Sequence, residues 1–378
     1  MEPPTTADAA LTDELRGLGL GAGLHGLGFT GADPFPEVRR EMERRAASGE
    51  SAALRFTYAD PAVATDVTRS FPWARSLVVG AMAYLPAAGS PGPAEPGTAV
   101  VARFATSDHY APLRRALARI ADRLEGAGHR AEVLVDDNRL VDRAAAVRAG
   151  VAWWGKSTLV LAPGAGPWLL VGSVATDALL APDQPMQRSC GTCTACIPAC
   201  PTGAITAPGI LDARRCLAHV LQAPGPIPME LRPLVGDRLY GCDDCLTACP
   251  PGSALAERSA DPAGRISLVE VLGAADRPLL ARFEHFYIPR NRARFLRRNA
   301  LVVLGNSGDR SLTGVAAGFL GHPDALLRGH AAWALGALGG PMARAALSQA
   351  APGERDPGAA AEMAAALEGA VAVAGTLP

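Results

Sequence analysis

The stretch Cys190-Gly-Thr-Cys193-Thr-Ala-Cys196-Ile-Pro-Ala-Cys200-Pro201 has the most specific residue spacing in this 378-residue chain. Two gaps of two residues and one gap of three, closed by a proline, reproduce the cysteine run of bacterial ferredoxins. In that run three thiolates bind one 4Fe-4S cluster and the fourth reaches a second cluster. The stretch therefore predicts two clusters in one small fold, which favours electron transfer over a purely structural role.

The remaining cysteines supply the other thiolates that two clusters need. A second run, Cys242-x2-Cys245-x3-Cys249-Pro250, has three cysteines, and Cys216 lies alone between the runs. Reciprocal crossing between the runs predicts two ligand sets: Cys190, Cys193, Cys196 and Cys249 for one cluster, and Cys200, Cys216, Cys242 and Cys245 for the other. A pair of zinc sites is the alternative, because Cys-x2-Cys pairs also build zinc ribbons. Zinc requires neither the third Cys-x2 repeat nor the Cys-x3-Cys-Pro ending, so the spacing favours iron-sulfur clusters.

Composition places the chain among globular proteins without a charge excess. Hydrophobic residues make up 49% and charged residues 19%, and 36 Lys and Arg balance 37 Asp and Glu. Any basic site must therefore be local. The first residues lack the basic and apolar regions of a secretory signal, and no apolar run approaches the roughly 20 residues that span a bilayer. We expect a cytoplasmic monomer without membrane contact, in which thiols bind metal rather than form disulfides.

Outward from the cysteines, hydrophobic periodicity predicts three parts. Before them, strands and helices alternate, with residues 1–50 mostly helical, strands at 76–84 and 131–135, helices at 110–124 and 138–149, and further strand-like runs at 158–162 and 168–174. After them, Arg298-Asn-Ala-Leu-Val-Val-Leu-Gly305 resembles Gly329-His-Ala-Ala-Trp-Ala-Leu-Gly336, as in a helical solenoid. The predicted fold is an α/β N-terminal domain (1–180), a ferredoxin-like double-cubane insert (181–260) and C-terminal α-helical, HEAT-like repeats (261–378).

The segment Gly150-Val-Ala-Trp-Trp-Gly-Lys-Ser157 matches the phosphate-loop pattern by its letters alone. A phosphate loop follows a strand and opens a helix. Here a predicted helix precedes the segment and a strand-like run follows it, so we do not expect nucleotide binding. Lys156 is the only lysine in the chain, which raises the question of why an ammonium rather than a guanidinium stands there. Compositional accident is the alternative.

Several blocks in this order resemble the epoxyqueuosine reductase family, the cobalamin-dependent iron-sulfur enzymes of queuosine tRNA modification. They are the Val-Asp segment at 135–136 leading to Arg143-Ala, Ala149-Gly-Val-Ala-Trp-Trp-Gly-Lys156, Cys200-Pro-Thr-Gly-Ala204, Leu211-Asp-Ala-Arg-Arg-Cys216, Gly241-Cys-Asp-Asp-Cys245 and Arg298-Asn-Ala300. The resemblance implies a two-electron deoxygenation that turns an epoxide at the wobble position of tRNA into an alkene. It also implies that two clusters supply electrons singly to cobalamin.

The same resemblance implies roles for individual residues. Asp136 matches the family's proton donor, and a positioned acid suits the step because an alkoxide is a poor leaving group. On residue types alone, Asp136 or Asp137 could instead cap the following helix. Lys156, Ser157 and Asp243 are the expected cofactor-binding residues within the matching blocks.

The chain departs from the family pattern near these residues. Ser157 stands where the block usually ends in Asn, Ala145 replaces an aromatic residue, His109-Tyr110 reverses the usual order, and Pro251 replaces Trp. No Asp-x-His-x-x-Gly motif is present to supply a histidine ligand to cobalt. Cobalamin therefore rests on the resemblance, and a related cobalamin reductase acting on a small molecule, such as a dehalogenase, is the alternative enzyme.

A local basic and aromatic segment runs from Arg282 to Arg298. Its predicted tRNA-binding residues are Arg290, Arg292, Arg294, Arg297 and Arg298, with Phe and Tyr residues between them. Arginines bind phosphates and aromatic rings stack on unpaired bases, which suits an anticodon stem-loop. The alternative is a solvated helix face with its aromatics in the core. The expected electron donor is a low-potential protein of flavodoxin or ferredoxin type. A non-catalytic electron carrier is the alternative from another class, and it leaves the first 180 residues without a role.

Overall fold

A computed structural model describes residues 7–52, 54–84, 97–258, 265–369 and 371. Its contacts divide the chain into two compact units, which we treat separately. Unit 1 comprises residues 1–87, 108–214 and 244–259, and unit 2 comprises residues 88–107, 215–243 and 260–378. The domain boundaries at residues 180 and 260 stay predictions. No helix within the described residues has the length and apolar character needed to cross a membrane.

Unit 1 is built around a four-stranded sheet with helices on both faces. Its elements in chain order are α1 (Ala9–Gly21), β1 (Gly26–Gly31), α2 (Pro36–Ala47), α3 (Pro61–Ala64), α4 (Val67–Ser70), β2 (Ser76–Ala83), α5 (Tyr110–Gly126), β4 (Ala131–Val135), α6 (Asp142–Arg148), β5 (Trp153–Trp154), β6 (Val160–Leu161), β7 (Leu169–Thr176), β8 (Ile205–Ala207), β9 (Ile210–Leu211), α9 (Asp244–Thr247) and α10 (Pro250–Arg258). The sheet order is β1-β2-β7-β4, and every neighbouring pair is antiparallel.

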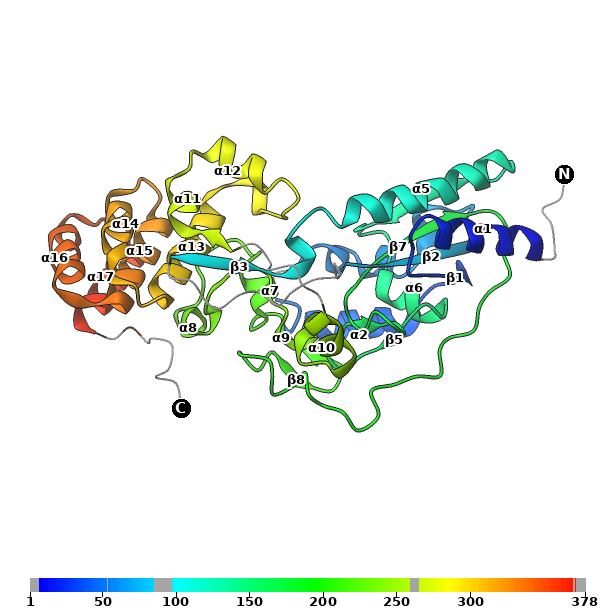
Figure 1. Ribbon diagram of the computed structural model, residues 1–378, viewed down its shortest axis with the longest axis horizontal. Helices are drawn as coiled ribbons and strands as arrows, with labels where there is room; N and C mark the ends of the chain where they lie inside the picture. The colour runs from blue at the N-terminus through cyan, green and yellow to red at the C-terminus, as the bar shows by residue number, and fades with distance from the viewer. Residues whose placement is uncertain (1–6, 53, 85–96, 259–264, 370, 372–378) are drawn as a thin grey trace. The chain divides into compact units, whose positions relative to one another are not determined.

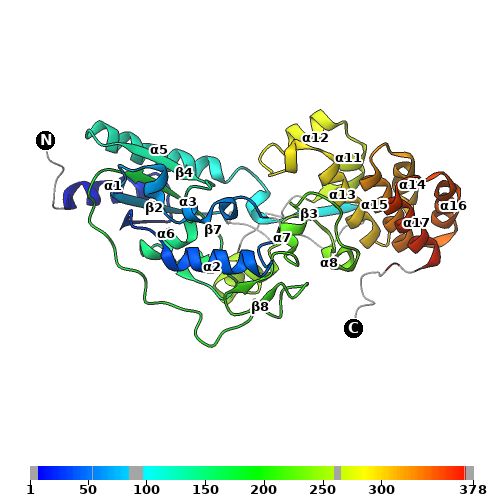
Figure 2. The same ribbon diagram turned by 180° about the vertical axis from the view of Figure 1, so that it is seen from behind.

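The faces of this sheet explain why its central strands are continuous apolar runs. Leu117 of α5 approaches Gly80 of β2 and Gly172 of β7 on one face. On the other face, Leu77 and Val79 share a core with the alanines of α6. Figures 1 and 2 show α1 and α5 along one face and α6 on the other. Strands covered on both sides lose the polar alternation of a half-exposed strand.

The elements of unit 1 confirm most of the predicted periodicity and correct part of it. Strands β2, β4 and β7 and helix α5 occupy the predicted ranges within a few residues. The mostly helical assignment of residues 1–50 is wrong at Gly26–Gly31, where β1 pairs with β2. The strand-like run at 158–162 is reduced to β6, which forms a short hairpin with β5. Segment 150–157 thus begins after α6 and contains β5, the first strand of this hairpin, and β6 rather than a helix follows it, as the rejection of a phosphate loop requires.

Unit 2 combines a small mixed sheet with a stack of helices. Its elements are β3 (Thr98–Val101), α7 (Leu217–Val220), α8 (Arg232–Val235), β10 (Arg238–Tyr240), β11 (Ile266–Ser267), α11 (Leu268–Gly273), α12 (Asp276–Arg282), α13 (Arg294–Asn306), α14 (Thr313–Gly318), α15 (Ala325–Leu338), α16 (Gly340–Ala350) and α17 (Pro357–Glu368). Helix α15 packs against both α13 and α17, and Figure 2 shows these helices in yellow-orange to red. Trp333 of α15 is fully buried in the core.

Candidate active site

Asp136 lies directly after β4, at the edge of the sheet of unit 1. Its backbone is in the left-handed region at φ 52°, which is uncommon for a residue other than glycine and is frequent at functional sites. The side chain reaches the surface. Even so, the surrounding protein atoms raise its pKa, Asp137 raises it further, and the charge of Arg114 opposes both effects. Asp136 thus favours the protonated form more than a free carboxyl does.

Asp137 has a different environment from its neighbour. Its Oδ1 accepts hydrogen bonds from the backbone N–H of Arg139 at 2.8 Å and from Nε of the same residue at 2.9 Å. These bonds to Arg139 lower the pKa of Asp137. No side-chain hydrogen bond to Asp136 occurs within the described part of the chain. The turn-forming role therefore falls to Asp137, and Asp136 stays available for chemistry.

Two further acids lie close enough to Asp136 to interact with its charge. Burial raises the pKa of Tyr110, at the start of α5, to about 12, and the charges of Asp136 and Asp142 add to the effect. Asp142, the first residue of α6, has a buried Oδ1 without a hydrogen-bond partner. Its pKa lies well above the usual range because of burial and the charge of Asp136, although Arg143 acts in the opposite direction. Three elements thus bring three proton-holding groups together.

The expected cofactor residues have specific partners. Lys156 follows β5, and its Nζ donates a hydrogen bond to the carbonyl oxygen of Gly191 at 2.7 Å, between two predicted cluster ligands. Ser157 is buried with 8% of its surface exposed. The carboxylate of Asp243 accepts a hydrogen bond from the backbone N–H of Arg103 at 2.6 Å.

The first predicted ligand set gathers in unit 1. Burial raises the pKa of the Cys249 thiol, and Cys190, Cys196 and Cys193 raise it further. The Cys196 thiol has a raised pKa for the same reasons, while the charge of Lys156 acts to lower it. Cys249 is therefore close to the first run, as reciprocal crossing requires. The ligand roles themselves stay predictions.

The second predicted set is distributed over short elements. Cys200 Sγ accepts a hydrogen bond from the backbone N–H of Ala204 at 3.2 Å. Cys216 precedes α7, Cys242 follows β10, and Cys245 lies in α9. None of the eight cysteines is in a disulfide, and all belong to the described residues. In those residues no group of three or more His, Cys, Asp or Glu side chains is arranged to hold a single metal ion.

The predicted tRNA-binding arginines separate into exposed and interior residues. Arg290 and Arg292 are exposed, whereas Arg294 forms an ion pair with Asp324 at 3.1 Å. Arg297 and Arg298 are buried at 8% and 1% exposure. The structure therefore does not support the prediction that these two residues bind phosphates.

Their guanidinium groups have partners within the chain. Arg297 donates to Asp276 at 2.6 Å, and Arg298 donates to the carbonyl oxygens of Ala223 and Gly225 at 2.8 and 2.5 Å. Burial lowers the pKa of Arg298 to about 9. The aromatics also divide, because Phe283, Phe286 and Phe295 are in the core and Tyr287 is 67% exposed. Spacing alone could not separate these groups.

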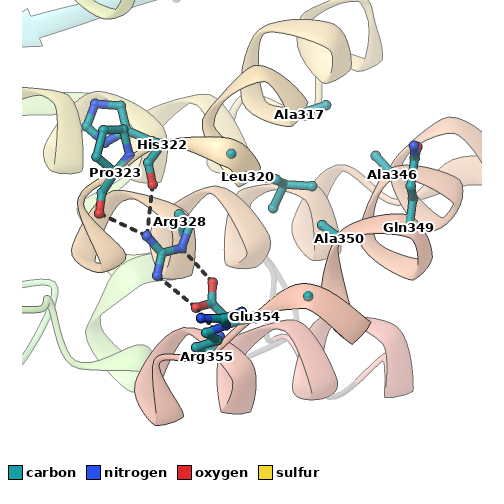
Figure 3. A pocket seen from close by; sticks show the side chains of 12 residues that line it. Ala317, Leu320, His322, Pro323, Arg328, Ala346, Gln349, Ala350, Glu354 and Arg355 are labelled. Carbon is teal, nitrogen blue, oxygen red and sulfur yellow. Dashed lines mark hydrogen bonds and ion pairs between the residues drawn. The ribbon is translucent and has the colours of Figure 1, made fainter.

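A cavity of about 680 Å³ lies elsewhere, among the helices of unit 2. Figure 3 shows Arg328 on its wall, where the guanidinium binds the carboxylate of Glu354 at 2.6 and 2.7 Å and the backbone oxygens of His322 and Pro323. The described residues that line it include none of the predicted site residues. Because the guanidinium group of Arg328 is already paired with Glu354, we do not assign a ligand to this cavity.

Comparison with known proteins identifies both the cluster-binding region and the helical region. Residues 189–252 match the family of 4Fe-4S double cluster binding domains, which decides against zinc, and residues 291–368 match HEAT repeats. The chain is 31% identical to an epoxyqueuosine reductase of Bacillus subtilis over 92% of each chain. It is 37% identical to one of Xanthomonas campestris, over 63% of this chain and 70% of that protein.

Solved structures match over nearly the whole chain. A crystal structure of selenomethionine-labelled epoxyqueuosine reductase has a TM-score of 0.88 at 30% identity, covering 95% of this chain and 99% of that chain. A crystal structure of epoxyqueuosine reductase with an epoxyqueuosine-modified tRNA-Tyr stem loop has a TM-score of 0.87 at 30% identity, covering 96% and 99%. The α/β region, the double-cluster region and the helical repeats thus occur together in proteins of one activity.

Proposed function

The chain belongs to the epoxyqueuosine reductase family, an oxidoreductase family, and from this membership we propose that it reduces epoxyqueuosine to queuosine at the wobble position of tRNA. Turning the epoxide into an alkene consumes two electrons and two protons and releases water. The protein must therefore deliver electrons to the epoxide and a proton to the departing oxygen. The observation that carries the proposal is the contrast between two adjacent carboxyl groups. Asp137 is hydrogen-bonded to Arg139, whereas Asp136 has a raised pKa and therefore holds its proton more readily than a free carboxyl.

Asp136 is the proposed proton donor to the departing oxygen. Its raised pKa increases the fraction of enzyme that carries the proton near neutral pH. A general acid in position contributes a rate factor of about 10² to 10⁴. Burial raises the pKa values of Tyr110 and Asp142 as well, so the proposed acid lies beside two other groups that favour their protonated forms.

Two clusters are the proposed electron path. The raised thiol pKa values at Cys196 and Cys249 are those of clustered, partly buried thiols, and iron binding deprotonates such groups. This donor chemistry fits a 4Fe-4S cluster on Cys190, Cys193, Cys196 and Cys249. We propose the remaining four cysteines, Cys200, Cys216, Cys242 and Cys245, as ligands of the second cluster.

Cobalamin is the proposed cofactor at the substrate, and the described side chains fit a polar ligand there. Asp142 Oδ1 and Trp153 Nε1 are buried without hydrogen-bond partners, on α6 and β5, which pack together. The amide groups at the periphery of cobalamin offer partners for both atoms. When bound, cobalamin supplies the reducing chemistry at the epoxide, while the protein supplies orientation and a proton. Ser157 lies on the same hairpin and is the next proposed contact. Lys156 and Asp243 also stay proposed cofactor contacts, each with the protein partner described above.

Arg290, Arg292 and Tyr287 are the proposed tRNA contacts. All three are exposed, and they combine cations for phosphates with a ring for an unpaired base. The first electrons are proposed to come from a flavodoxin or ferredoxin type protein. We also propose that the enzyme acts as a cytoplasmic monomer, with catalysis in residues 1–180, the clusters in 181–260 and tRNA binding in 261–378.

Nucleoside analysis of tRNA tests the proposal. Protein reconstituted with iron, sulfide and cobalamin is incubated with a reductant and tRNA that carries epoxyqueuosine, and the digested nucleosides are separated by mass. We expect loss of the epoxide nucleoside and gain of queuosine, and no conversion when cobalamin is left out. A fully loaded protein that leaves the tRNA unchanged contradicts the proposed substrate. Conversion without cobalamin contradicts the proposed cofactor.

A further inference from the structure

Lys156 connects the hairpin β5–β6 to the loop that carries the first cysteines. Its Nζ donates to the carbonyl oxygen of Gly191 at 2.7 Å, and Gly191 lies directly after Cys190. Its own carbonyl oxygen accepts a hydrogen bond from the backbone N–H of Gly209 at 2.9 Å, in the turn between β8 and β9. The only ammonium group among the side chains of the chain is therefore bound to the cysteine loop, and the backbone of the same residue is bound to the β8–β9 turn.

The charge of Lys156 acts on the thiols of this loop. Its Nζ is hydrogen-bonded to the backbone of Gly191, between Cys190 and Cys193, so the positive charge lies beside two of the predicted cluster ligands. Another cation is near: Arg188 lies over the ring of Trp153 at 5.6 Å, but its side chain is exposed. Solvent screens an exposed charge, so Arg188 acts more weakly than its distance suggests.

A fixed positive charge has a definite effect on a cluster at these thiols. Reduction adds one electron and makes the cluster more negative, so a nearby cation stabilises the reduced state. Local charge and hydrogen bonding are among the factors that set cluster potentials. We propose that Lys156 is a positioning residue whose charge raises the reduction potential of the cluster on Cys190, Cys193, Cys196 and Cys249. The inference rests on the proposed cluster ligands and not on the tRNA substrate.

Potentiometric titration followed by electron paramagnetic resonance tests this inference without tRNA or turnover. Fully loaded wild type is compared with K156M, which removes the charge, with K156R, which retains it, and with R188Q, which removes a screened charge. In K156M we expect the midpoint potential of one cluster to become more negative. At a fixed solution potential, the ratio of reduced to oxidised cluster should fall roughly tenfold, which corresponds to about 59 mV for a one-electron couple. The other midpoint stays unchanged. K156R stays near wild type, and R188Q shifts less than K156M.

Acetylation of Lys156 in the loaded protein provides a second test if K156M fails to bind iron. Because Lys156 is the only lysine, an amine-directed reagent applied to loaded wild type modifies that residue and the N-terminal amine alone. K156R reports the effect of the N-terminal amine by itself. Acetylated wild type should show the same negative shift, and acetylated K156R should not. Unchanged midpoints after complete acetylation, or equal shifts in K156M and K156R, overturn the role of the charge. Absent tRNA turnover with the expected shift contradicts the proposed function and leaves this inference standing.

Discussion

Asp136 and Asp137 are adjacent in the chain, and their carboxyl groups differ in how readily they lose a proton. Arg139 lowers the pKa of Asp137 through hydrogen bonds, and burial raises the pKa of Asp136. A carboxylate that accepts several hydrogen bonds loses its proton readily, whereas a partly desolvated one retains it. The sequence alone left both residues as candidates for a helix cap, because nothing in the letters Asp-Asp shows which side chain the turn uses. The burial of the neighbouring Asp142 could not be predicted from the sequence, because it depends on how α6 packs.

Asp142 predicts a pH dependence of stability. Its pKa is near 3.8 when unfolded and well above that when folded, so the native state binds the proton more tightly. Below the unfolded pKa the group is protonated in both states. As the pH rises above it, the native state is progressively destabilised until the folded pKa is passed. We therefore expect D142N to become more stable than wild type as the pH rises, by up to about 1.4 kcal/mol per pH unit within that window.

Urea denaturation of loaded wild type and D142N at several pH values measures this difference directly. Comparing the two proteins cancels the titration of shared groups that do not interact with Asp142. A stability difference that does not change with pH would show that Asp142 titrates as an ordinary carboxyl.

Helix α13 explains why a basic segment contains residues with opposite roles. It packs against α11, α8 and α15, so its arginines meet protein on several sides. Arg298 donates hydrogen bonds to the half-buried carbonyl oxygens of Ala223 and Gly225. Charge spacing predicted one basic face, and tertiary packing divided it. The same kind of limit applies to β1, whose glycine-rich sequence Gly26–Gly31 lacks a strand signal and pairs because β2 offers an open edge.

Arg298 and Arg290 give a matched comparison of stability. R298M should lower the free energy of unfolding by about 1 to 3 kcal/mol per acceptor left unsatisfied. R290M removes an exposed side chain and should change it little, within about 0.5 kcal/mol. Denaturation midpoints of the two variants check this. Equal denaturation midpoints would show that the hydrogen bonds of Arg298 do not stabilise the fold.

The exposed arginines predict the salt dependence of tRNA binding. Each phosphate contact in single-stranded RNA contributes about 0.7 to the slope of log affinity against log salt. The double variant R290M/R292M should therefore flatten the slope by about 1.4. Filter binding at several salt concentrations measures the slope. An unchanged slope and affinity would show that these side chains only face solvent.

For the whole molecule, the order of the cysteines along the chain predicts how two clusters share their ligands. Spacing predicts crossing, because the Cys-x3-Cys-Pro ending occurs in both runs. Its structural counterpart is Cys249, whose thiol interacts with Cys190, Cys193 and Cys196. The sequence could not give the partners of Lys156, since Gly191 and Gly209 meet that residue only after the chain has folded.

Single cysteine variants test the shared ligands. C249A and C190A should lose the same electron paramagnetic resonance signal and about half of the iron, because each removes one of four thiolates from the same cluster. C216A and C242A should lose the other signal. Iron analysis and spectra of the reduced proteins check both expectations. Loss of one common signal in C249A and C242A would contradict crossing.

Single-turnover conversion of epoxyqueuosine tRNA by chemically reduced, fully loaded enzyme tests the central claim most directly. The electron donor is removed from the comparison, and the product is counted per enzyme. Wild type should form queuosine, and D136N should form it at least about 10² times more slowly, because Asn is nearly isosteric and carries no acidic proton. Iron and cobalamin content must match in the two proteins, and D137N serves as the neighbouring control. No product from wild type, or a wild-type rate in D136N, would contradict the account.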